Sequence, residues 1–454
     1  MKTRLKVALD GYRPLFERLY SLDVSTAWER YERLVPQNRL ALGGLFCHDC
    51  LDGPCHTDPL GKGAKLGVCG RTPLEMAAAW LAMITARGFI RRLSGIDDRL
   101  PGIETVPEPV LSLISMASRY RMDMGAFAAT LRDAAYEAAI TEANEAGGEP
   151  VLAGGRVRCG PGARNPLRPA VLLDGLSGSA AKAMAENLAD TGLECVLSGA
   201  ERDGFSVGLP VICPSSLAGT VVLAGGVDAV ITGDRSYARV MAQGEVDVQA
   251  PVFYASNFRP SDVVEAAKRH FTDYPPVPLI GRVVEWDGFE EPTAGYLIVA
   301  GGLGVKKTCG ESTIGLTEIA LKAGFSVMAS GDAASVLGEA GLMGSGNRCV
   351  PVDNPAGLGW AMSLLRDKTL ARPVYAVLPE ATRTRDIAAA FEFASLGAPT
   401  YLGTPLPVWG PGLGEVLGWN GGGGLPLVNY PSEESVEVIW QRLVAIPSTS
   451  WAQK

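Results

Sequence analysis

Long apolar runs are missing from this sequence, and their absence excludes a class of protein. No stretch reaches the roughly 20 consecutive apolar residues that a membrane-spanning helix needs. The first eight residues read Met-Lys-Thr-Arg-Leu-Lys-Val-Ala and lack the longer apolar segment of a signal peptide. We therefore expect a cytoplasmic protein with no membrane partner.

An excess of positive charge is also missing. The chain has 41 Lys and Arg residues against 49 Asp and Glu residues, which gives a formal net charge of -8. Nucleic acids and anionic membrane surfaces are bound by clustered Lys and Arg side chains. We expect neither among the partners of this protein.

Histidine is scarce, and only one of the 3 histidines lies outside a single cysteine-rich segment. That residue, His270, falls on a predicted amphipathic helix beside Lys268 and Arg269, so a surface position is expected. The motif Asp174-Gly-Leu-Ser177-Gly-Ser179 offers a serine, but a surface histidine is not placed to act as its base. Serine-hydrolase chemistry is not expected.

Cysteine is more abundant, and its distribution points to metal binding. The 454 residues include 9 cysteines, an odd number, and Cys47, Cys50, Cys55 and Cys69 crowd into one short segment. Such crowding in a large chain favours metal ligation in a reducing compartment over a disulfide framework. With 47% hydrophobic and 20% charged residues, the chain has the composition of a globular protein of two or three domains.

The residue pattern predicts an α/β protein with a helical start. Residues 1 to about 145 show helical spacing, interrupted by the cysteine segment 47–69, and the all-helical domain is expected to span 1–165. Thr72-Pro73-Leu74-Glu75 has a capping Thr, a Pro in the first turn and a Glu three residues after the cap. A helix is therefore predicted to begin there and to end near Arg92.

Two Rossmann-like parallel α/β domains are predicted to follow, at 166–290 and 291–454. The Gly- and Pro-rich segment 146–169 is expected to be a connector. Beyond it, short apolar runs that end in Gly or Asp alternate with helical stretches, which is typical of a parallel sheet. The runs expected to be strands begin at Pro169, Thr220, Ala229, Tyr296, Phe325, Pro373 and Pro399.

The cysteine spacing is Cys47-x2-Cys50-x4-Cys55-x13-Cys69, with Gly and Pro at the turns. Four thiolates that converge from one loop are the ligand set of a [4Fe-4S] cluster. A structural zinc site is the alternative, although such sites usually use two separate Cys-x2-Cys pairs. His48 and His56 lie inside the segment and are expected to be exposed or to support the ligands rather than bind the metal.

These residues resemble a known family. Cys47-His-Asp-Cys50-Leu-Asp-Gly-Pro-Cys55 and Leu66-Gly-Val-Cys69-Gly70 resemble the cubane-binding loop of nickel carbon monoxide dehydrogenases and, more loosely, that of hybrid-cluster (prismane) proteins. The resemblance covers nearly the whole chain, with a shortened helical domain, and implies an iron–sulfur oxidoreductase. It continues in Gly226-Val-Asp-Ala-Val-Ile, Ala323-Gly-Phe-Ser-Val-Met-Ala-Ser-Gly331, Arg348-Cys349-Val-Pro-Val-Asp353-Asn354 and Leu396-Gly-Ala-Pro-Thr-Tyr-Leu-Gly403.

Most ligands of the family's nickel–iron–sulfur cluster, which takes one His and five Cys, are missing here. The resemblance places Leu173-Asp174-Gly175 at the His motif. Of the five cysteine positions, only Cys349 keeps a cysteine. The other positions are aligned with Leu197, Ser236, Gly302 and Asp332.

The family's proton-transfer residues are also replaced. Its Lys aligns with Arg385, and its helical-domain His aligns near Arg92. Arginine stays protonated near neutral pH and cannot shuttle protons, so carbon monoxide oxidation by the family's mechanism is not expected. Asn38 and Phe46 stand where the family's subunit-bridging cluster takes two cysteines, so that cluster is expected to be absent.

A second metal site is possible in the last domain. Cys309 and Cys349 are expected to follow strands, at the ends where open α/β sheets place their ligands. With Asp332 and Cys195 they could form a remodelled site; the alternative is that these cysteines are buried packing residues.

Two functional hypotheses follow from the sequence. In the first, the cubane of an oxidoreductase passes electrons to or from a diverged centre or small-molecule substrate in a cleft between the α/β domains, lined by Arg385, Asp332, Cys309 and Cys349. In the second, a catalytically silent relative keeps only the cubane for electron relay, redox sensing or assembly. A redox partner such as a ferredoxin or a reductase subunit is expected, and the resemblance implies a homodimer.

Overall fold

The computed structural model divides the chain into two compact units. The first consists of Met1–Arg33 and Gly148–Gly357, and the second of Leu34–Gly147 and Leu358–Lys454. The three-domain division made from the sequence stays a prediction. The structure describes residues 8–447 except 59–61, 94–105, 120, 146–154, 177, 200–207, 234–247, 275, 278, 287–291, 293, 302, 305, 307, 345, 353–357, 368–371, 420–423 and 430–433.

A 7-stranded sheet forms the centre of the first unit, in the order β8-β7-β4-β5-β6-β3-β9. All neighbours are parallel except β3 and β9, which pair antiparallel. All five residues of β4 are buried, as expected for a strand covered on both faces. The strands are β3 (Gly155–Cys159), β4 (Ala170–Asp174), β5 (Glu194–Ser198), β6 (Val211–Cys213), β7 (Ala229–Thr232), β8 (Val252–Tyr254) and β9 (Arg282–Trp286).

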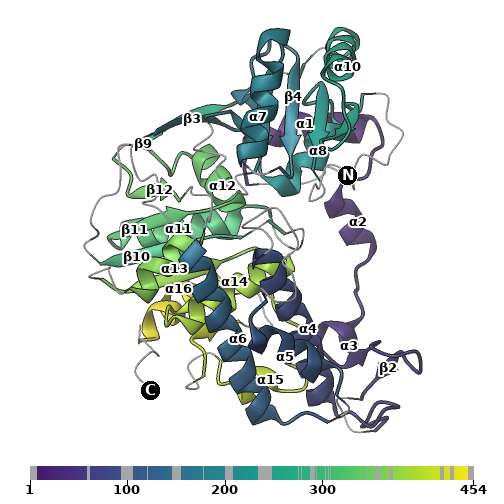
Figure 1. Ribbon diagram of the computed structural model, residues 1–454, viewed down its shortest axis with the longest axis vertical. Coiled ribbons are helices and arrows are strands. Elements are labelled where there is room, and N and C mark those ends of the chain that lie inside the picture. The colour runs from purple at the N-terminus through teal and green to yellow at the C-terminus, as the bar shows by residue number, and fades with distance from the viewer. Residues whose placement is uncertain are drawn as a thin grey trace. The chain divides into compact units, whose positions relative to one another are not determined.

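Helices of the first unit pack around this sheet, and Figure 1 shows α7, α8 and α10 beside β4. The first turns of the chain join the same core: Tyr12, Leu15 and Phe16 are almost fully buried and cluster with Ile212 and Val230. The helices are η1 (Asp10–Tyr12), α1 (Arg13–Ser21), α2 (Ala27–Arg33), η3 (Pro161–Ala163), α7 (Gly178–Leu188), η4 (Ala189–Thr191), η5 (Ser215–Leu217), α8 (Ala218–Leu223) and α10 (Pro260–Asp273).

The first unit also contains three parallel strands, β10 (Gly295–Val299), β11 (Phe325–Ala329) and β12 (Cys349–Pro351). Every residue of these strands is buried. Helix α11 (Glu311–Lys322) connects β10 to β11, and α12 (Asp332–Ala340) follows β11. This alternation of strand and helix confirms the predicted parallel α/β class.

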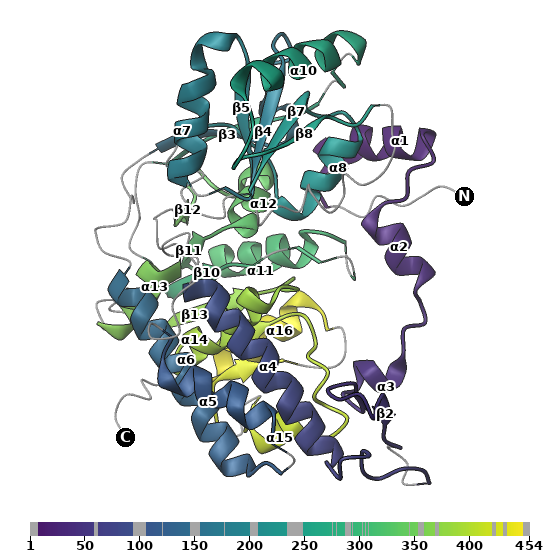
Figure 2. The same cartoon turned by 45° about the vertical axis from the view of Figure 1, so that its right-hand side comes forward.

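The second unit combines long helices with three parallel strands, β13 (Val374–Leu378), β14 (Thr400–Leu402) and β15 (Leu427–Val428). Figure 2 shows α4, α5 and α6 side by side, with α14 and α15 close to them. The helices are α3 (Arg39–Leu42), α4 (Pro73–Leu93), α5 (Glu108–Ala117), α6 (Met124–Glu145), α13 (Leu358–Arg366), α14 (Thr384–Ser395), α15 (Leu413–Val416) and α16 (Val436–Ala445).

The start of α4 confirms the capping prediction. The Thr72 backbone N–H donates to Glu75 Oε2 at 2.8 Å, and the Glu75 N–H donates to Thr72 Oγ1 at 3.3 Å. The other carboxylate oxygen of Glu75 accepts from the Met122 backbone N–H at 3.2 Å. This reciprocal cap satisfies amide groups that have no partner within the helix. It also fixes the point at which the chain leaves the cysteine segment.

Three predictions about secondary structure were wrong. The apolar run from Thr220 lies in α8, because a short buried run suits a helix as well as a strand. Residues 155–159, expected to be a connector, form β3. The cysteine segment, expected to contain no strand, holds the short strands β1 (Phe46–Cys47) and β2 (Cys55–His56).

Helices α4 and α14 approach each other closely at Gly88. A Cβ added there would lie 2.3 Å from Thr384 O and 2.7 Å from Ala388 Cβ. Gly88→Ala is expected to destabilise the fold by about 1–3 kcal/mol, because the helices must separate. Chemical denaturation checks this. Gly125→Ala, where the nearest atom would be Asp123 Oδ1 at 3.2 Å, is the control and should be close to neutral. Equal stability of the two variants would contradict the proposed helix contact.

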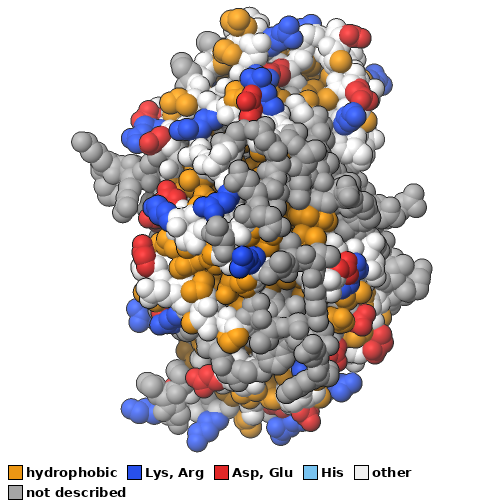
Figure 3. Space-filling view, turned by 90° about the vertical axis from the view of Figure 1, so that its left-hand side faces the viewer, with side chains coloured by type: hydrophobic (Ala, Val, Ile, Leu, Met, Phe, Trp, Pro, Cys, Tyr) orange, Lys and Arg blue, Asp and Glu red, His pale blue; other side chains and the backbone are white. Residues whose placement is uncertain are grey.

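No helix in the described ranges is both long and apolar enough to cross a bilayer. On the described part of the face in Figure 3, Lys and Arg side chains are interspersed with Asp and Glu rather than gathered in one area. This mixed distribution agrees with the net charge of -8.

Candidate metal centre

The four clustered cysteines lie on a small hairpin and the turn that follows it. Strands β1 and β2 pair antiparallel, which places Cys47 directly opposite Cys55. Cys50 is exposed in the loop between the strands, whereas Cys47, Cys55 and Cys69 are half-buried. The hairpin is closed at its base by the Thr57 N–H, which donates to Leu45 O at 2.9 Å. Local pairing therefore brings the first and third cysteines together.

The fourth cysteine is brought in by a tight turn. Gly70 N–H donates to Gly67 O at 2.8 Å, and Gly67 N–H donates to Arg71 O at 2.9 Å. Within this turn the Val68 N–H points at Cys55 Sγ, at 3.5 Å. An N–H donor at a sulfur favours the thiolate, which is the form that binds metal. The turn before Cys69 thus contributes to the surroundings of Cys55.

Arg71 ties the cysteine segment to the helices of the second unit. Its side chain is 6% exposed and contacts Asp49 Oδ2 at 3.0 Å. Its Nη2 donates to Ala117 O and to Arg119 O, both at 2.7 Å. A planar guanidinium can serve three acceptors at once, and a lysine cannot reproduce that geometry. The loop between Cys47 and Cys50 is therefore anchored through Asp49.

The donor set fits an iron–sulfur cluster. Burial raises the pKa of the Cys47 thiol, and a hydrogen bond from the Asp49 backbone partly offsets this. Among the described residues, no three His, Cys, Asp or Glu side chains stand close enough to hold one metal ion. Four cysteine thiolates, one for each iron, are the ligand set that a four-iron cluster takes.

The other residues of this region have structural roles. His48 and His56 are both exposed, as expected. Asn38 caps α3, because its Oδ1 accepts from the N–H groups of Leu40 and Ala41 at 3.0 and 3.2 Å. Phe46 lies in β1 with its ring 5.9 Å from that of His48. Neither Asn38 nor Phe46 is a sulfur ligand.

A second polar cluster lies in the first unit, at the carboxyl ends of β4, β5 and β6. Asp174, the last residue of β4, accepts a short hydrogen bond from Ser198 Oγ at the end of β5. Asp332, at the start of α12, accepts from the Ser215 backbone N–H at 2.8 Å. The four side chains are at most 5% exposed. The sequence signal for this cluster was an apolar run that ends in Asp, as β4 does at Asp174.

This second cluster is tightly packed around Gly199. A Cβ added at Gly199 would lie 2.1 Å from Ser215 Oγ and 2.6 Å from Asp332 Oδ1. Leu197, one of the residues at a replaced ligand position, is buried in β5. Protein atoms therefore occupy the space beside Asp332. Ser236, Gly302, Asp353, Asn354 and the candidate nucleophile Ser177 lie outside the described residues.

The remaining cysteines are buried. Cys309 packs in the core of the first unit with Tyr12 and Cys213. Cys349 was expected to follow a strand, which is wrong: it is the first residue of β12 and pairs in register with Val327. Burial raises the pKa of Cys349 and raises that of Cys195 to about 11, with Glu194 adding to the shift at Cys195. The second metal site stays a prediction.

Arg92 and Arg385 both lie in the second unit, where Arg92 is the centre of a buried ion cluster. Its Nε donates to Glu392 Oε2 at 2.6 Å, and its Nη2 makes a shorter contact with Glu142 Oε2. Burial alone would lower the pKa of Arg92, but Glu142 and Glu392 hold it above its ordinary value. Arg385 is the second residue of α14; its side chain is 31% exposed and lies 3.9 Å from Asp386. The guanidinium of Arg92 thus stays charged.

The same cluster predicts a pH dependence of stability. Burial raises the pKa of Glu392 to about 8, although Arg92 pulls it down. The folded chain then holds a proton that the unfolded chain releases above its ordinary pKa near 4.5, so stability falls as pH rises toward 8. Glu392→Gln should flatten this slope by up to about 1.4 kcal/mol per pH unit. Denaturation at pH values from 5 to 9 measures it; an unchanged slope would contradict the protonated state.

His270 was expected at the surface, which is wrong: it is 6% exposed. Its Nδ1 lies 3.1 Å from Asp228 Oδ1, and its Nε2 lies 3.1 Å from Val248 O. Asp228 also contacts Arg164 at 3.1 Å and accepts from the Ala170 N–H at 2.8 Å. These hydrogen bonds hold α10 against the sheet. It leaves His270 a structural residue.

Comparisons with known proteins agree with the resemblance seen in the sequence. No family model matches the chain. Over 65 residues it is 45% identical to the carbon monoxide dehydrogenase of Rhodospirillum rubrum, a match that spans 14% of this chain and 10% of that protein. Over 74 residues it is 38% identical to carbon monoxide dehydrogenase 1 of Methanosarcina mazei, spanning 16% of this chain and 12% of that protein. The matched segments thus span about a tenth of these relatives.

The fold agrees over the whole length. A nickel-free carbon monoxide dehydrogenase from Thermococcus sp. AM4 superposes with a TM-score of 0.75 at 15% identity, covering 98% of this chain and 97% of that one. Carbon monoxide dehydrogenase IV from Carboxydothermus hydrogenoformans gives 0.75 at 13% identity, covering 97% and 99%. Short sequence segments and the whole fold are thus both similar to those of carbon monoxide dehydrogenases.

Proposed function

We propose that this chain is a cytoplasmic iron–sulfur redox protein that binds one [4Fe-4S] cluster through Cys47, Cys50, Cys55 and Cys69. The observation that supports the proposal is the hairpin that places Cys47 opposite Cys55, with the turn before Cys69 beside Cys55. When bound, such a cluster gains and releases single electrons. The chain's own contribution is to hold the thiolates, to donate the Val68 N–H to a sulfur, and to anchor the loop through Arg71.

We do not expect this chain to oxidise carbon monoxide, because of the residues at the family's ligand and proton-transfer positions. Two of the positions aligned with family ligands are Asp174 and Asp332, and both accept hydrogen bonds in a packed region. Arg92 is held charged by two carboxylates and is therefore a poor proton carrier. We infer an electron-relay, redox-sensing or assembly role rather than catalysis at a nickel centre.

A second candidate is an oxidoreductase with a diverged centre for a small-molecule substrate. One observation favours it: Asp174 and Asp332 both lie close enough to the buried Cys213 thiol to raise its pKa, after the larger effect of burial. Two carboxylates and a thiol could bind an additional metal ion if the region opened. Iron above about four per chain, or bound nickel, would favour this candidate.

The partner of either function is a one-electron carrier. Cys50 is exposed, so one edge of the proposed cluster faces the surface of the second unit. A ferredoxin or a reductase subunit could exchange electrons there. Homodimer formation is proposed by analogy with the family.

Anaerobically purified protein tests the choice between these functions. The relay proposal predicts that a low-potential reductant adds one electron per chain and that carbon monoxide does not drive reduction of a viologen dye. Steady dye reduction that depends on carbon monoxide would show a working second centre and would overturn the relay proposal.

Replacement of Arg71 should weaken the cluster site. Arg71→Met leaves Asp49, Ala117 O and Arg119 O without their donor and should cost about 2–4 kcal/mol of local stability. We expect iron to pass to a chelator at least tenfold faster than in the unchanged protein. Lys62→Met removes the same charge from an exposed position of the same loop and serves as the control. Equal rates in the two variants would rule out this anchoring role.

A further inference from the structure

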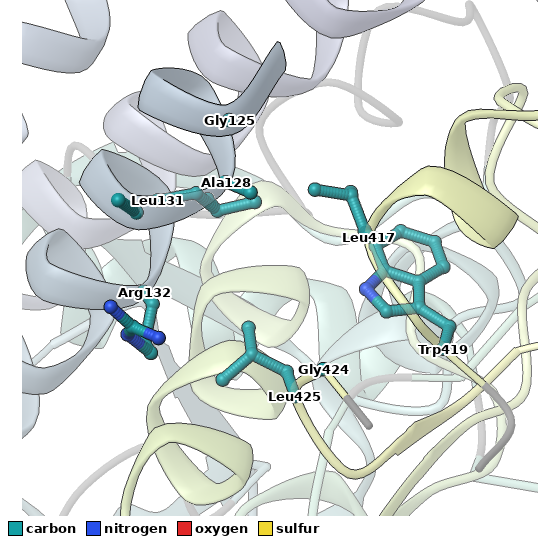
Figure 4. A pocket seen from close by; sticks show the side chains of 9 residues that line it. Gly125, Ala128, Leu131, Arg132, Leu417, Trp419, Gly424 and Leu425 are labelled. Atoms are coloured by element: carbon teal, nitrogen blue, oxygen red, sulfur yellow. The ribbon is translucent and has the colours of Figure 1, made fainter. Parts of the chain in front are cut away.

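A cavity of about 200 Å³ in the second unit lies between the start of α6 and four residues near the end of the chain, Leu417, Trp419, Gly424 and Leu425. It is partly open to solvent, and its walls are mostly apolar side chains and small residues. Figure 4 shows Ala128 and Leu131 of α6 on one side and Leu417, Trp419 and Leu425 on the other. The cavity is independent of the proposed function, because no cysteine of the metal centre lines it.

One wall of the cavity carries a hydrogen-bond donor that has no acceptor. Trp419 is 4% exposed, and its Nε1 makes no hydrogen bond within the described structure. Figure 4 shows this nitrogen on the ring edge that faces α6 across the cavity. The neighbouring indole of Trp409, in contrast, donates to Asn429 Oδ1 at 3.2 Å. A buried unpaired donor is costly, so an acceptor inside the cavity would stabilise it.

The position of this donor is fixed by its surroundings. The Trp419 ring lies 5.7 Å from the Phe391 ring and 6.1 Å from the Trp409 ring, in tilted and edge-on arrangements. The backbone is closely packed beside this ring, because a Cβ added at Gly424 would lie 1.9 Å from Leu417 O. The donor is therefore presented at a defined place and does not need a ligand to order it.

A cation lies at the rim of the cavity. Arg132 of α6 is one of its lining residues, and its side chain is 54% exposed. Its ion pair with the adjacent Asp133 is long, at 3.6 Å. The guanidinium can therefore turn toward a negative group at the mouth of the cavity. The cavity therefore suits a small ligand with an apolar body and an anionic group. The walls would contact the apolar body, and the N–H and the cation at the rim would contact the anionic group.

We propose that this cavity binds a small monocarboxylate with an aromatic or branched apolar body, whose carboxylate accepts from Trp419 Nε1 and pairs with Arg132. Benzoate is a suitable probe, and benzamide is its neutral counterpart with the same acceptor. For ligands of this size we expect a Kd of about 1 mM or tighter. Calorimetry or ligand-observed NMR on the full chain measures both.

Three variants and one control test the separate parts of the site. Trp419→Phe keeps an aromatic ring but loses the indole N–H and should weaken both probes about tenfold. Arg132→Gln should weaken benzoate about threefold and leave benzamide unchanged, while the exposed Arg121→Gln should change neither. Ala128→Leu fills the cavity from α6 and should abolish binding without touching the tryptophan packing.

Two results would contradict binding of the probe in this cavity. Absence of saturable binding at probe concentrations tenfold above the expected Kd would show that the cavity holds only water. Binding that survives both Trp419→Phe and Ala128→Leu would place the probe elsewhere on the chain. If Trp419→Phe fails to fold, the Ala128→Leu variant still decides the outcome.

Discussion

Replacement of Cys50 by Ser should remove the iron from this protein. A serine oxygen is a poor ligand for an iron–sulfur cluster, and three remaining thiolates hold a cubane weakly. We expect iron to fall from about four per chain to less than one, with loss of the brown absorbance. Because Cys50 is exposed, its replacement removes no core packing. Iron analysis and absorbance spectra of protein purified without air measure the change.

The matched control for this prediction is Cys195→Ser. Cys195 is one of the 9 cysteines but lies buried in β5, outside the cysteine segment. Its replacement should leave the iron content unchanged even if it lowers stability. A Cys50→Ser protein that stays brown and redox-active with full iron would remove Cys50 from the ligand set and contradict the main claim.

Replacement of Arg92 by Met should destabilise the second unit more than any surface substitution. Glu142 and Glu392 are 5% and 0% exposed at their side chains, and the Arg92 guanidinium contacts both of them. Removing one partner of a buried ion cluster typically costs about 3–5 kcal/mol, because the remaining charges stay buried. Denaturant titration followed by circular dichroism measures the loss.

Arg87→Met is the control for this effect. Arg87 lies on the same helix, α4, but is exposed, so its replacement should change stability by less than about 0.5 kcal/mol. The double variant Arg92→Met with Glu392→Gln should lose about as much stability as Arg92→Met alone, since Glu392 is already protonated below about pH 8 and Gln has nearly the same shape. If Arg92→Met and Arg87→Met lowered the stability by similar amounts, the burial of Arg92 would not be the cause of the loss.

Much of the fold could be predicted from local sequence. The start of α4 follows from Thr72, Pro73 and Glu75, because a reciprocal cap depends on residues next to one another in the chain. The buried run from Thr220 was wrongly predicted, because a fully buried run carries no periodicity that separates helix from strand. Strand β3 does show alternating burial, yet the surrounding Gly and Pro residues hid it.

The candidate sites could be predicted only where their residues are close together in the sequence. The cysteine spacing indicated the metal centre, because its residues are close in the chain. The role of Arg71 and the burial of His270 were missed, because their partners Ala117 and Asp228 lie far away in sequence. The polar cluster of Asp174 and Asp332 likewise depends on strands that meet only in the folded sheet.

The central claim is the cluster on the four cysteines, and metal and sulfide analysis with EPR on anaerobically purified protein tests it most directly. We predict about four irons and four sulfides per chain, one reducible cubane signal and neither nickel nor zinc. One zinc per chain with no sulfide would contradict the claim and identify the hairpin as a structural zinc site.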